Sequence, residues 1–228
     1  MSTALQPAPS ATPTRALPRA SESPGQVPIA TPPAAVFMVD RLHRLTLAQY
    51  HAMAEAGILA EGDRVELLGG LLVSKMTKKR PHVIGTDLVQ AALIRAIPAG
   101  WYVSMQNPVA IAEADSEPEP DIQVVRGSPR DYPDGTILPG HLGLVVEVSD
   151  SSVREDQTTK KALYALASIP FFWLINLPAN RVEAYADPTG PDPTPDYRRR
   201  SDHGPDDAIP LVLDGLEIAR IAVRDLLP

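Results

Sequence analysis

The sequence predicts a mixed α/β (α+β) fold built around a central sheet. Residues 142–148 form a nearly continuous run of large aliphatic side chains, which is typical of a central strand covered on both faces. Short strand patterns elsewhere alternate with only two or three helical segments. No internal repeat interrupts this order, so the chain is expected to form one mixed domain.

The first 36 residues differ in composition from the rest of the chain. They are rich in Pro, Ala, Ser and Thr, and they contain few large apolar side chains and no periodicity. Such a segment cannot bury enough apolar surface to offset the entropy cost of ordering it. Residues 1–36 are therefore expected to be a disordered leader, and residues 37–228 a single folded domain.

Capping and turn residues define the N-terminal elements of this domain. Thr46 is expected to cap a helix that ends at Gly57. Residues 64–68 and 71–75 flank a glycine pair, which predicts a tight hairpin. Apolar residues at helical spacing then predict a helix over 82–97.

The rest of the chain consists mainly of predicted strands. These strands cover residues 101–105, 107–112, 122–125, 142–148, 171–177, 181–186, 209–213 and 216–223. Ser152 and Glu155 have capping-box spacing, so a helix is expected from Ser152 to about Ala167. The segments 127–140 and 187–208 are rich in proline and polar residues and are expected to be irregular loops.

Composition excludes several classes of protein. The chain has no cysteine, which excludes a disulfide framework, a thiol nucleophile and a cysteine zinc site. No apolar run approaches the roughly 20 residues of a membrane span. The N-terminus lacks the basic start and apolar block of a secretory signal, so a cytoplasmic location is expected.

The net charge of −7 argues against a protein that coats nucleic acid through its overall field. Positive charge is nevertheless clustered, and a cluster could form a local basic strip. The two clusters are Lys75, Lys78, Lys79 and Arg80, and Arg198, Arg199 and Arg200. Each cluster is equally compatible with a solvated loop.

Two carboxylates lie on or beside predicted buried strands. Glu147 interrupts the aliphatic run, and Asp121 follows Pro120 at the start of a strand. A buried ionised carboxylate costs several kcal/mol unless it is paired, hydrogen-bonded or bound to a metal. Glu147 is therefore either a strand-end residue that faces solvent or pairs with an arginine, or part of a reactive centre. Asp121, taken alone, is better explained as a turn or cap residue.

The other polar candidates have ordinary explanations as well. Asp156 and Lys160 are four residues apart on a predicted helix, which is the spacing of a surface ion pair. Glu66 fits an outward position on an alternating strand, and His82 fits a solvated helix entry.

The order of these motifs is more specific than any one of them. They are Val65-Glu66-Leu-Leu-x-Gly70 followed by His82, Gln106-Asn-Pro-Val, Ser116-Glu-Pro-Glu-Pro-Asp121, Val145-Val-Glu147-Val-Ser149-Asp-Ser-Ser152, Asp156-x-x-x-Lys160-x-x-x-Tyr164, and Ile169-Pro170-x-x-Trp173. In this succession the chain resembles, over about residues 42–227, the Uma-two family of restriction endonucleases in the PD-(D/E)XK nuclease superfamily.

The resemblance implies a restriction-endonuclease-like mixed central sheet flanked by helices, preceded by the helix and hairpin. It implies that Asp121 and Glu147 are the metal-binding acids, with Glu66 and His82 as accessory site residues. The usual lysine lies two residues after the central acid, where this chain has Ser149, so Lys160 is expected to replace it. Leu71 stands where the family usually has an acid.

The implied activity is hydrolysis of DNA phosphodiester bonds with Mg²⁺, or Mn²⁺, held by the two acids. A homodimer is a further implication of the family, and a membrane partner is not expected. The first rival hypothesis is a degenerate module that binds nucleic acid or a partner without cleavage. The second rival makes the acids ordinary ion pairs. A separation of more than about 8 Å between the two carboxylates would contradict a shared ion with oxygen ligands at 2.0–2.6 Å.

Overall fold

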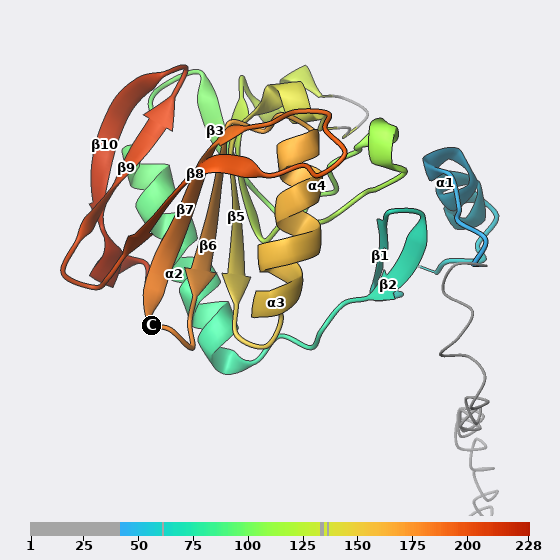
Figure 1. The fold of residues 1–228 in the computed structure, drawn as a ribbon, viewed down its shortest axis with the longest axis horizontal. Helices are drawn as coiled ribbons and strands as arrows, with labels where there is room; N and C mark the ends of the chain where they lie inside the picture. Colours follow the sequence, from blue (N-terminus) through green and yellow to red (C-terminus); the bar gives the residue numbers. More distant parts are fainter. Residues whose placement is uncertain (1–41, 61, 133–134, 136) are drawn as a thin grey trace, which may run out of the picture. The chain divides into compact units, whose positions relative to one another are not determined.

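A six-stranded mixed sheet forms the centre of the fold (Figure 1). Its strands follow the order β3-β4-β5-β6-β7-β8. Their bounds are Trp101–Met105 (β3), Ile122–Arg126 (β4), Leu142–Ser149 (β5), Phe171–Asn176 (β6), Arg181–Pro188 (β7) and Tyr197–His203 (β8). Only the β5–β6 pair in this sheet is parallel; the other neighbours are antiparallel. A parallel pair requires a crossover connection, and the helical segment after β5 supplies it.

The computed structural model describes residues 42–60, 62–132, 135 and 137–228. Within it, residues 43–228 make up one unit. The predicted leader, residues 1–36, lies outside the described residues. Among the helices of the described part, none is long and apolar enough to span a membrane.

Each face of the sheet buries its own hydrophobic cluster. On one face α2 (Arg80–Ala96) packs through Val89 and Leu93, together with the antiparallel hairpin of β9 (Ala208–Leu213) and β10 (Leu216–Ala222). On the other face α4 (Lys161–Leu166) packs onto β5, β6 and β7.

Alternate residues of β5 belong to the two clusters. Val146 and Val148 lie in the cluster on the α2 face, and Val145 lies in the cluster on the α4 face. Burying one such side chain contributes about 1.5–3 kcal/mol. The continuous aliphatic run of β5 therefore reflects a strand that is covered on both faces, as predicted.

The N-terminal elements follow the prediction. α1 (Leu47–Glu55) begins at Thr46, which forms a capping box with Gln49. β1 (Val65–Leu68) and β2 (Leu71–Ser74) pair antiparallel across two glycines with positive φ.

The helix expected after Ser152 is divided into three parts. α3 (Val153–Glu155) is followed by a π-helical turn (Asp156–Lys160) and then by α4. The predicted capping box is wrong, because Ser152 makes no side-chain cap bond and instead donates its hydroxyl to Asp156 Oδ2 at 2.6 Å. π-Helical turns are rare and are frequently found at functional sites.

Two further predictions are corrected. Residues 107–112 form no strand; this segment folds back on the Pro-rich segment after it, with bonds from Val109 N–H to Pro118 O and from Ile111 N–H to Ser116 O. Residues 187–208 are not wholly irregular, because they contain β8 at the edge of the sheet. Most β8 side chains are exposed, and this exposure explains why the strand has the polar sequence of a loop.

Candidate active site

Strand register places Asp121 and Glu147 side by side. In the antiparallel β4–β5 pair Ile122 lies opposite Val146, so one further step brings Asp121 opposite Glu147. Directly opposed residues have Cβ atoms about 4.5–5.5 Å apart. Both side chains are on the α4 face, both are buried, and both line one cavity. This register is compatible with two carboxylates that share one ion.

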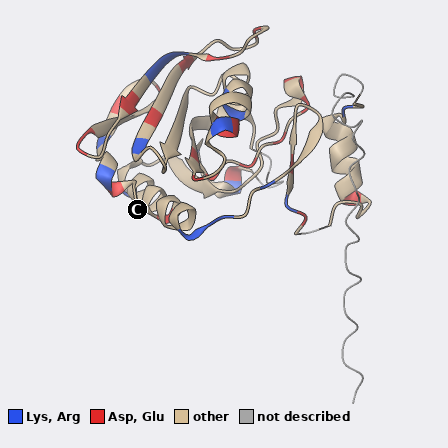
Figure 2. Ribbon diagram, turned by 60° about the horizontal axis from the view of Figure 1, so that its bottom comes forward, with Lys and Arg blue, Asp and Glu red and all other residues tan. Residues whose placement is uncertain are grey.

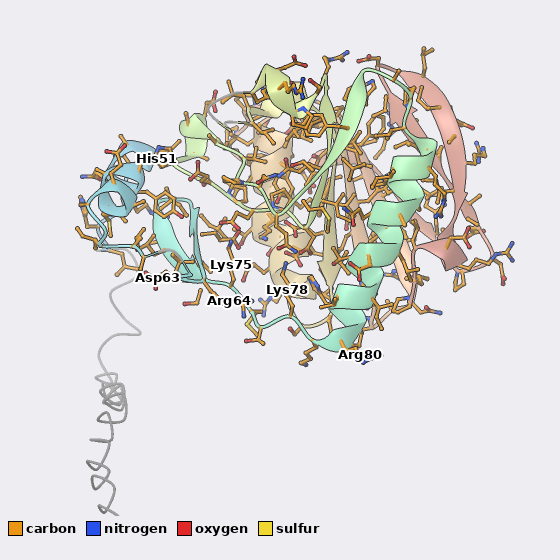
Figure 3. The ribbon with its side chains drawn as sticks, turned by 180° about the vertical axis from the view of Figure 1, so that it is seen from behind. His51, Asp63, Arg64, Lys75, Lys78 and Arg80 are labelled. Carbon is orange, nitrogen blue, oxygen red and sulfur yellow. The ribbon has the colours of Figure 1, made fainter. Side chains whose placement is uncertain are left out.

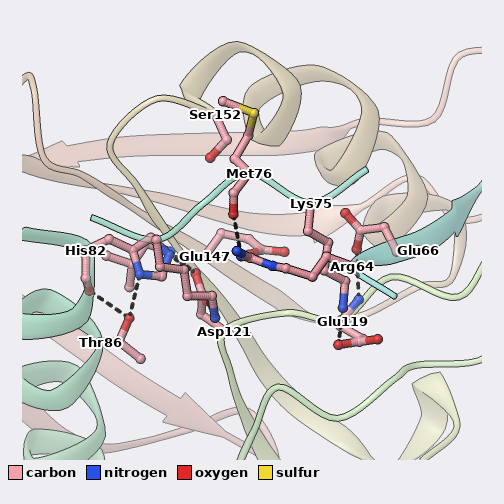
Figure 4. Close-up of polar contacts among 12 residues, drawn as sticks. Arg64, Glu66, Lys75, Met76, His82, Thr86, Glu119, Asp121, Glu147 and Ser152 are labelled. Atoms are coloured by element: carbon pink, nitrogen blue, oxygen red, sulfur yellow. Dashed lines mark hydrogen bonds and ion pairs between the residues drawn. The ribbon is translucent and has the colours of Figure 1, made fainter. Parts of the chain in front are cut away.

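Asp121 is held by donors from three segments of the chain: the segment after β2, α2 and β5. Figure 4 shows Asp121 together with His82 and Glu147. Its Oδ2 accepts the backbone N–H of Val148 at 3.0 Å and lies 3.0 Å from His82 Nε2. Its Oδ1 lies 3.1 Å from Lys78 Nζ. Burial alone would raise the pKa of Asp121, but the hydrogen bond and charge of His82, followed by Lys78 and the Val148 N–H, lower it. Asp121 is therefore ionised at neutral pH.

Glu147 has fewer partners and the opposite pKa shift. Lys160 Nζ at 3.1 Å and the Tyr164 hydroxyl at 2.6 Å both donate to Oε1. None of the described residues donates a hydrogen bond to Oε2. Burial is the largest cause that raises the pKa of Glu147, to about 8; the charge of Lys160 opposes it, and the charges of Asp156 and Asp121 add to it. The expected alternative, a solvent-facing strand-end carboxylate, is wrong.

Lys160 lies among three carboxylates. In addition to Glu147, its Nζ lies 3.3 Å from Glu66 Oε1 and 4.0 Å from Asp156 Oδ1. Burial would lower the pKa of Lys160, but these carboxylates outweigh burial and raise it. The surface ion pair expected from the Asp156/Lys160 spacing is wrong, because both side chains are buried.

The π-helical turn positions this lysine. Asp156, at the start of the turn, accepts hydrogen bonds from the hydroxyls of Ser149 and Ser152. Ser149 stands where the superfamily usually has its lysine, and here it anchors the turn whose last residue is Lys160.

Glu66 and His82 also face the cavity. Glu66, on β1, is buried, and its Oε2 accepts the backbone N–H of Glu119 at 3.1 Å. His82, in the first turn of α2, is nearly buried and contacts Asp121. The ordinary alternatives, an outward position for Glu66 and a solvated position for His82, are both wrong. The structure brings all five predicted residues, Glu66, His82, Asp121, Glu147 and Lys160, to one cavity.

The cavity has a volume of about 480 Å³. Its acidic side chains lie at the sheet and in the π-helical turn, and its cationic side chains include Lys75, Lys78 and Lys79 from the segment between β2 and α2. Within the described part of the chain, no three His, Asp or Glu side chains are arranged as a metal site. Asp121 and Glu147 are the two carboxylates here that could hold an ion, because Mg²⁺ commonly binds to one or two carboxylates and keeps several waters.

The profile of the Uma2 family, described as "Putative restriction endonuclease", matches residues 47–223. The chain belongs to the Uma2 family. The match extends from α1 to the turn after β10 and includes every residue of the site. The family resemblance recognised in the sequence is confirmed.

A solved structure shares the fold of this Uma2 protein. It is described as a putative nuclease belonging to DUF820 from Anabaena variabilis ATCC 29413, and it matches with a TM-score of 0.59 at 15% sequence identity. The match covers 80% of this chain and 97% of that one. The predicted nuclease-like mixed sheet is thereby confirmed. No curated protein matches the chain.

The two basic clusters of the Uma2 protein differ in their surroundings. Figure 3 places Lys75, Lys78 and Arg80 along the segment that runs from β2 into α2. Lys75 and Lys78 line the cavity. On β8, Arg198 pairs with Asp187, and Arg200 pairs with Asp202. Figure 2 shows Lys and Arg on both segments. Only the first cluster contributes to the lining of the cavity.

Sequence reasoning missed three groups that contact the site residues. Tyr164 appeared in the motif pattern, but no role was assigned to it, and its hydroxyl binds Glu147. Ser152 was interpreted only as a helix cap. Lys78 was assigned to the basic cluster, and its contact with Asp121 was not foreseen. The regular spacing of Asp156, Lys160 and Tyr164 along one helix was the signal that could have identified the tyrosine.

Proposed function

We propose that this Uma2 protein is an endonuclease that depends on a divalent metal ion and hydrolyses DNA phosphodiester bonds in the cavity. The observation that carries the proposal is the pair of buried carboxylates, Asp121 just before β4 and Glu147 on the neighbouring β5, beside a buried lysine. Family membership supports a nuclease, and the choice of DNA as substrate rests on the family description.

Asp121 and Glu147 are the residues that would hold the ion. Their carboxylate oxygens are ligands that Mg²⁺ and Mn²⁺ accept. Glu147 Oε2, which receives no hydrogen bond from the described residues, is suited to ligation. When bound, such an ion polarises a phosphoryl oxygen and lowers the pKa of water.

The remaining site residues supply fixed charge. Lys160 lies among three carboxylates that raise its pKa, so it stays an ammonium at neutral pH and acts as a hydrogen-bond donor. We therefore assign to Lys160 the neutralisation of charge on the reacting phosphate, in preference to proton abstraction. Tyr164 and Glu66 hold the two sides of this lysine–carboxylate cluster in place.

The basic residues at the cavity complete the proposal for DNA. Lys78 and Lys79 line the cavity, and Arg80 follows them at the start of α2. Such side chains contact backbone phosphates and position a duplex without reading its sequence. A homodimer and a cytoplasmic location belong to the proposal as well, and only the family resemblance and the composition support them.

A non-cleaving DNA-binding module is the second candidate. One observation favours it: both oxygens of Asp121 already accept donors, from Lys78 on one side and from His82 and Val148 on the other. In this alternative the protein binds DNA but leaves it intact.

Nicking of supercoiled plasmid tests the proposal. Wild-type protein is compared with Asp121→Ala and Glu147→Ala in Mg²⁺, in Mn²⁺ and in EDTA. The expected result is metal-dependent nicking by the wild type and a loss on the order of 10²-fold or more in both variants. Glu217→Ala is the matched control, because it removes an exposed acid on β10 that is paired with Arg220 outside the cavity.

Equal nicking by all four proteins would contradict the proposal and point to a contaminant or another site. Retained DNA binding with no nicking under any condition would favour the non-cleaving module.

A further inference from the structure

The two lysines that contact the candidate metal ligands differ in how firmly they are held. Lys160 contacts three carboxylates, and its side chain is 9% exposed. Among the described residues Lys78 forms an ion pair only with Asp121, and its side chain is 33% exposed. Lys160 is therefore a fixed part of the site, whereas Lys78 can leave its partner and be solvated.

Asp121 does not need Lys78 to keep its position. The Val148 N–H and His82 both contact Oδ2, and these two donors come from β5 and α2. Lys78 is the one described residue that contacts Oδ1. An ion that binds Asp121 would therefore take Oδ1 and compete with the ammonium of Lys78 for the same oxygen.

The backbone near Lys78 is anchored on both sides, so departure of the side chain does not require a loop to move. The N–H of Lys75 donates to Arg64 O at 2.7 Å, and Arg64 donates to Met76 O at 2.7 Å. On the other side, α2 begins at Arg80. Rotation of the Lys78 side chain is sufficient to carry its ammonium from Asp121 to another anion at the cavity.

We infer that Lys78 is an exchangeable counter-ion: it neutralises Asp121 in the metal-free protein, and a divalent cation displaces it so that it can bind a backbone phosphate of the substrate. This inference rests on the proposed function, because it takes Asp121 as a metal ligand. It gives Lys78 a positioning role and makes binding of the metal and binding of DNA mutually dependent.

The inference has a direct thermodynamic consequence. The metal must break the contact between Lys78 and Asp121, so removal of the ammonium strengthens metal binding. The freed ammonium then favours DNA, so metal strengthens DNA binding and, by linkage, DNA strengthens metal binding by the same factor. A lysine that served only to bind phosphate would affect metal affinity no more than the neighbouring cation Lys79 does.

Direct titration with Mn²⁺, followed by the EPR signal of the free ion, tests this consequence without relying on cleavage. Wild-type protein is compared with Lys78→Met, Lys78→Gln and Asp121→Asn. Lys79→Met is the matched control, because it removes a neighbouring cation that also lines the cavity but contacts Asp150 at 3.8 Å. We expect both Lys78 variants to bind Mn²⁺ on the order of 5-fold or more tightly than wild type, and Lys79→Met to differ less than twofold from it.

Weaker or unchanged Mn²⁺ affinity in both Lys78 variants, with tight binding by wild type and loss in Asp121→Asn, would overturn the role of Lys78 and leave the proposed function intact. Equal binding, or no binding, in wild type and Asp121→Asn would overturn the metal site itself and the inference with it.

A second measurement tests the DNA half of the inference. Fluorescence anisotropy of a labelled duplex, with Ca²⁺ as the cation, gives the DNA affinity of each protein with and without metal. We expect Ca²⁺ to tighten DNA binding more in wild type than in Lys78→Met. An equal effect of Ca²⁺ in the two proteins would overturn the transfer of Lys78 to phosphate.

Discussion

Glu147 and Glu183 occupy the same row of the central sheet and have opposite environments. Leu174 of β6 lies opposite Glu147 of β5 and opposite Glu183 of β7. Opposed residues point to the same face, so both glutamates are on the α4 face, and both are buried. The pKa of Glu147 is raised to about 8, whereas the pKa of Glu183 is lowered to about 2.

The number of donors explains the difference. Burial alone would raise the pKa of both carboxyl groups. Five side chains surround Glu183 and lower its pKa or contact it directly: Tyr185, Asn176, Arg181, Gln157 and Arg200. Glu147 receives two donors, both on one oxygen, and faces a cavity.

We interpret Glu183 as a structural carboxylate and Glu147 as the candidate reactive one. Glu183 already has several hydrogen-bond donors, so it has little capacity left for a ligand. These donors come from β6, β7, β8 and the π-helical turn, and Glu183 therefore connects those elements. Among the described residues, no donor reaches the second oxygen of Glu147, which is why we propose that it accepts a cation. A buried carboxylate with too few donors is a better indicator of function than burial alone.

The largest effect is expected from removal of the charge beside Glu147. Lys160→Met leaves three buried carboxylates without their ammonium, which should cost about 3–5 kcal/mol of unfolding free energy at neutral pH. The cost should grow as pH rises through about 8, because Glu147, whose pKa is raised to about 8, must then ionise without its ammonium partner. Urea unfolding at several pH values measures it.

Lys161→Met is the matched control for this variant. Lys161 pairs at 2.7 Å with Asp196, whose side chain is 53% exposed, so its loss should cost only about 0.2–1 kcal/mol. Similar losses in the two variants would mean that Lys160 is an ordinary surface lysine in energetic terms.

Glu183→Gln should have the next largest effect. Loss of a charged acceptor in a saturated network should cost about 1.5–3 kcal/mol at pH 7. The folded-state pKa of Glu183 is below its ordinary value of 4.5, so its stabilisation is present above pH 4.5 and is lost as pH falls towards 2. The stability difference between wild type and variant should therefore shrink from pH 7 to pH 3. A constant difference in urea unfolding would contradict the assignment.

Glu147→Gln should show the opposite dependence on pH. In EDTA the folded protein keeps a proton on Glu147 up to about pH 8, while the unfolded chain loses it near 4.5. This group therefore makes wild-type stability fall as pH rises through that window. The variant lacks this loss, so its stability relative to wild type should increase by about 1.4 kcal/mol or more between pH 5 and pH 8. A relative stability that does not change with pH would mean that Glu147 is ionised throughout.

The strand that follows Asp121 and the strand that contains Glu147 could be predicted from the sequence, because their runs of apolar residues are local patterns. The burial of Lys160 could not be predicted in the same way. An acid and a lysine four residues apart have the same spacing in a surface pair and in a buried site, and the π-helical turn that Ser149 and Ser152 anchor has no simple pattern.

Tertiary context explains the other differences. β8 has a polar, arginine-rich sequence because it is an edge strand, so local composition predicted a loop. Glu183 was not singled out, because its donors come from the π-helical turn and from three strands. Only the family resemblance connected Glu66 and His82 with the two acids before the fold was known.

The most direct test of the contrast measures two properties of Glu147→Gln and Glu183→Gln in parallel: plasmid nicking in Mg²⁺ and the unfolding free energy at pH 7. Glu147→Gln should lose on the order of 10²-fold or more of the nicking activity while remaining folded. Glu183→Gln should lose stability while retaining most of its activity well below its unfolding midpoint. Full activity in Glu147→Gln, or an equal loss of activity in both variants, would contradict the division into one reactive and one structural carboxylate.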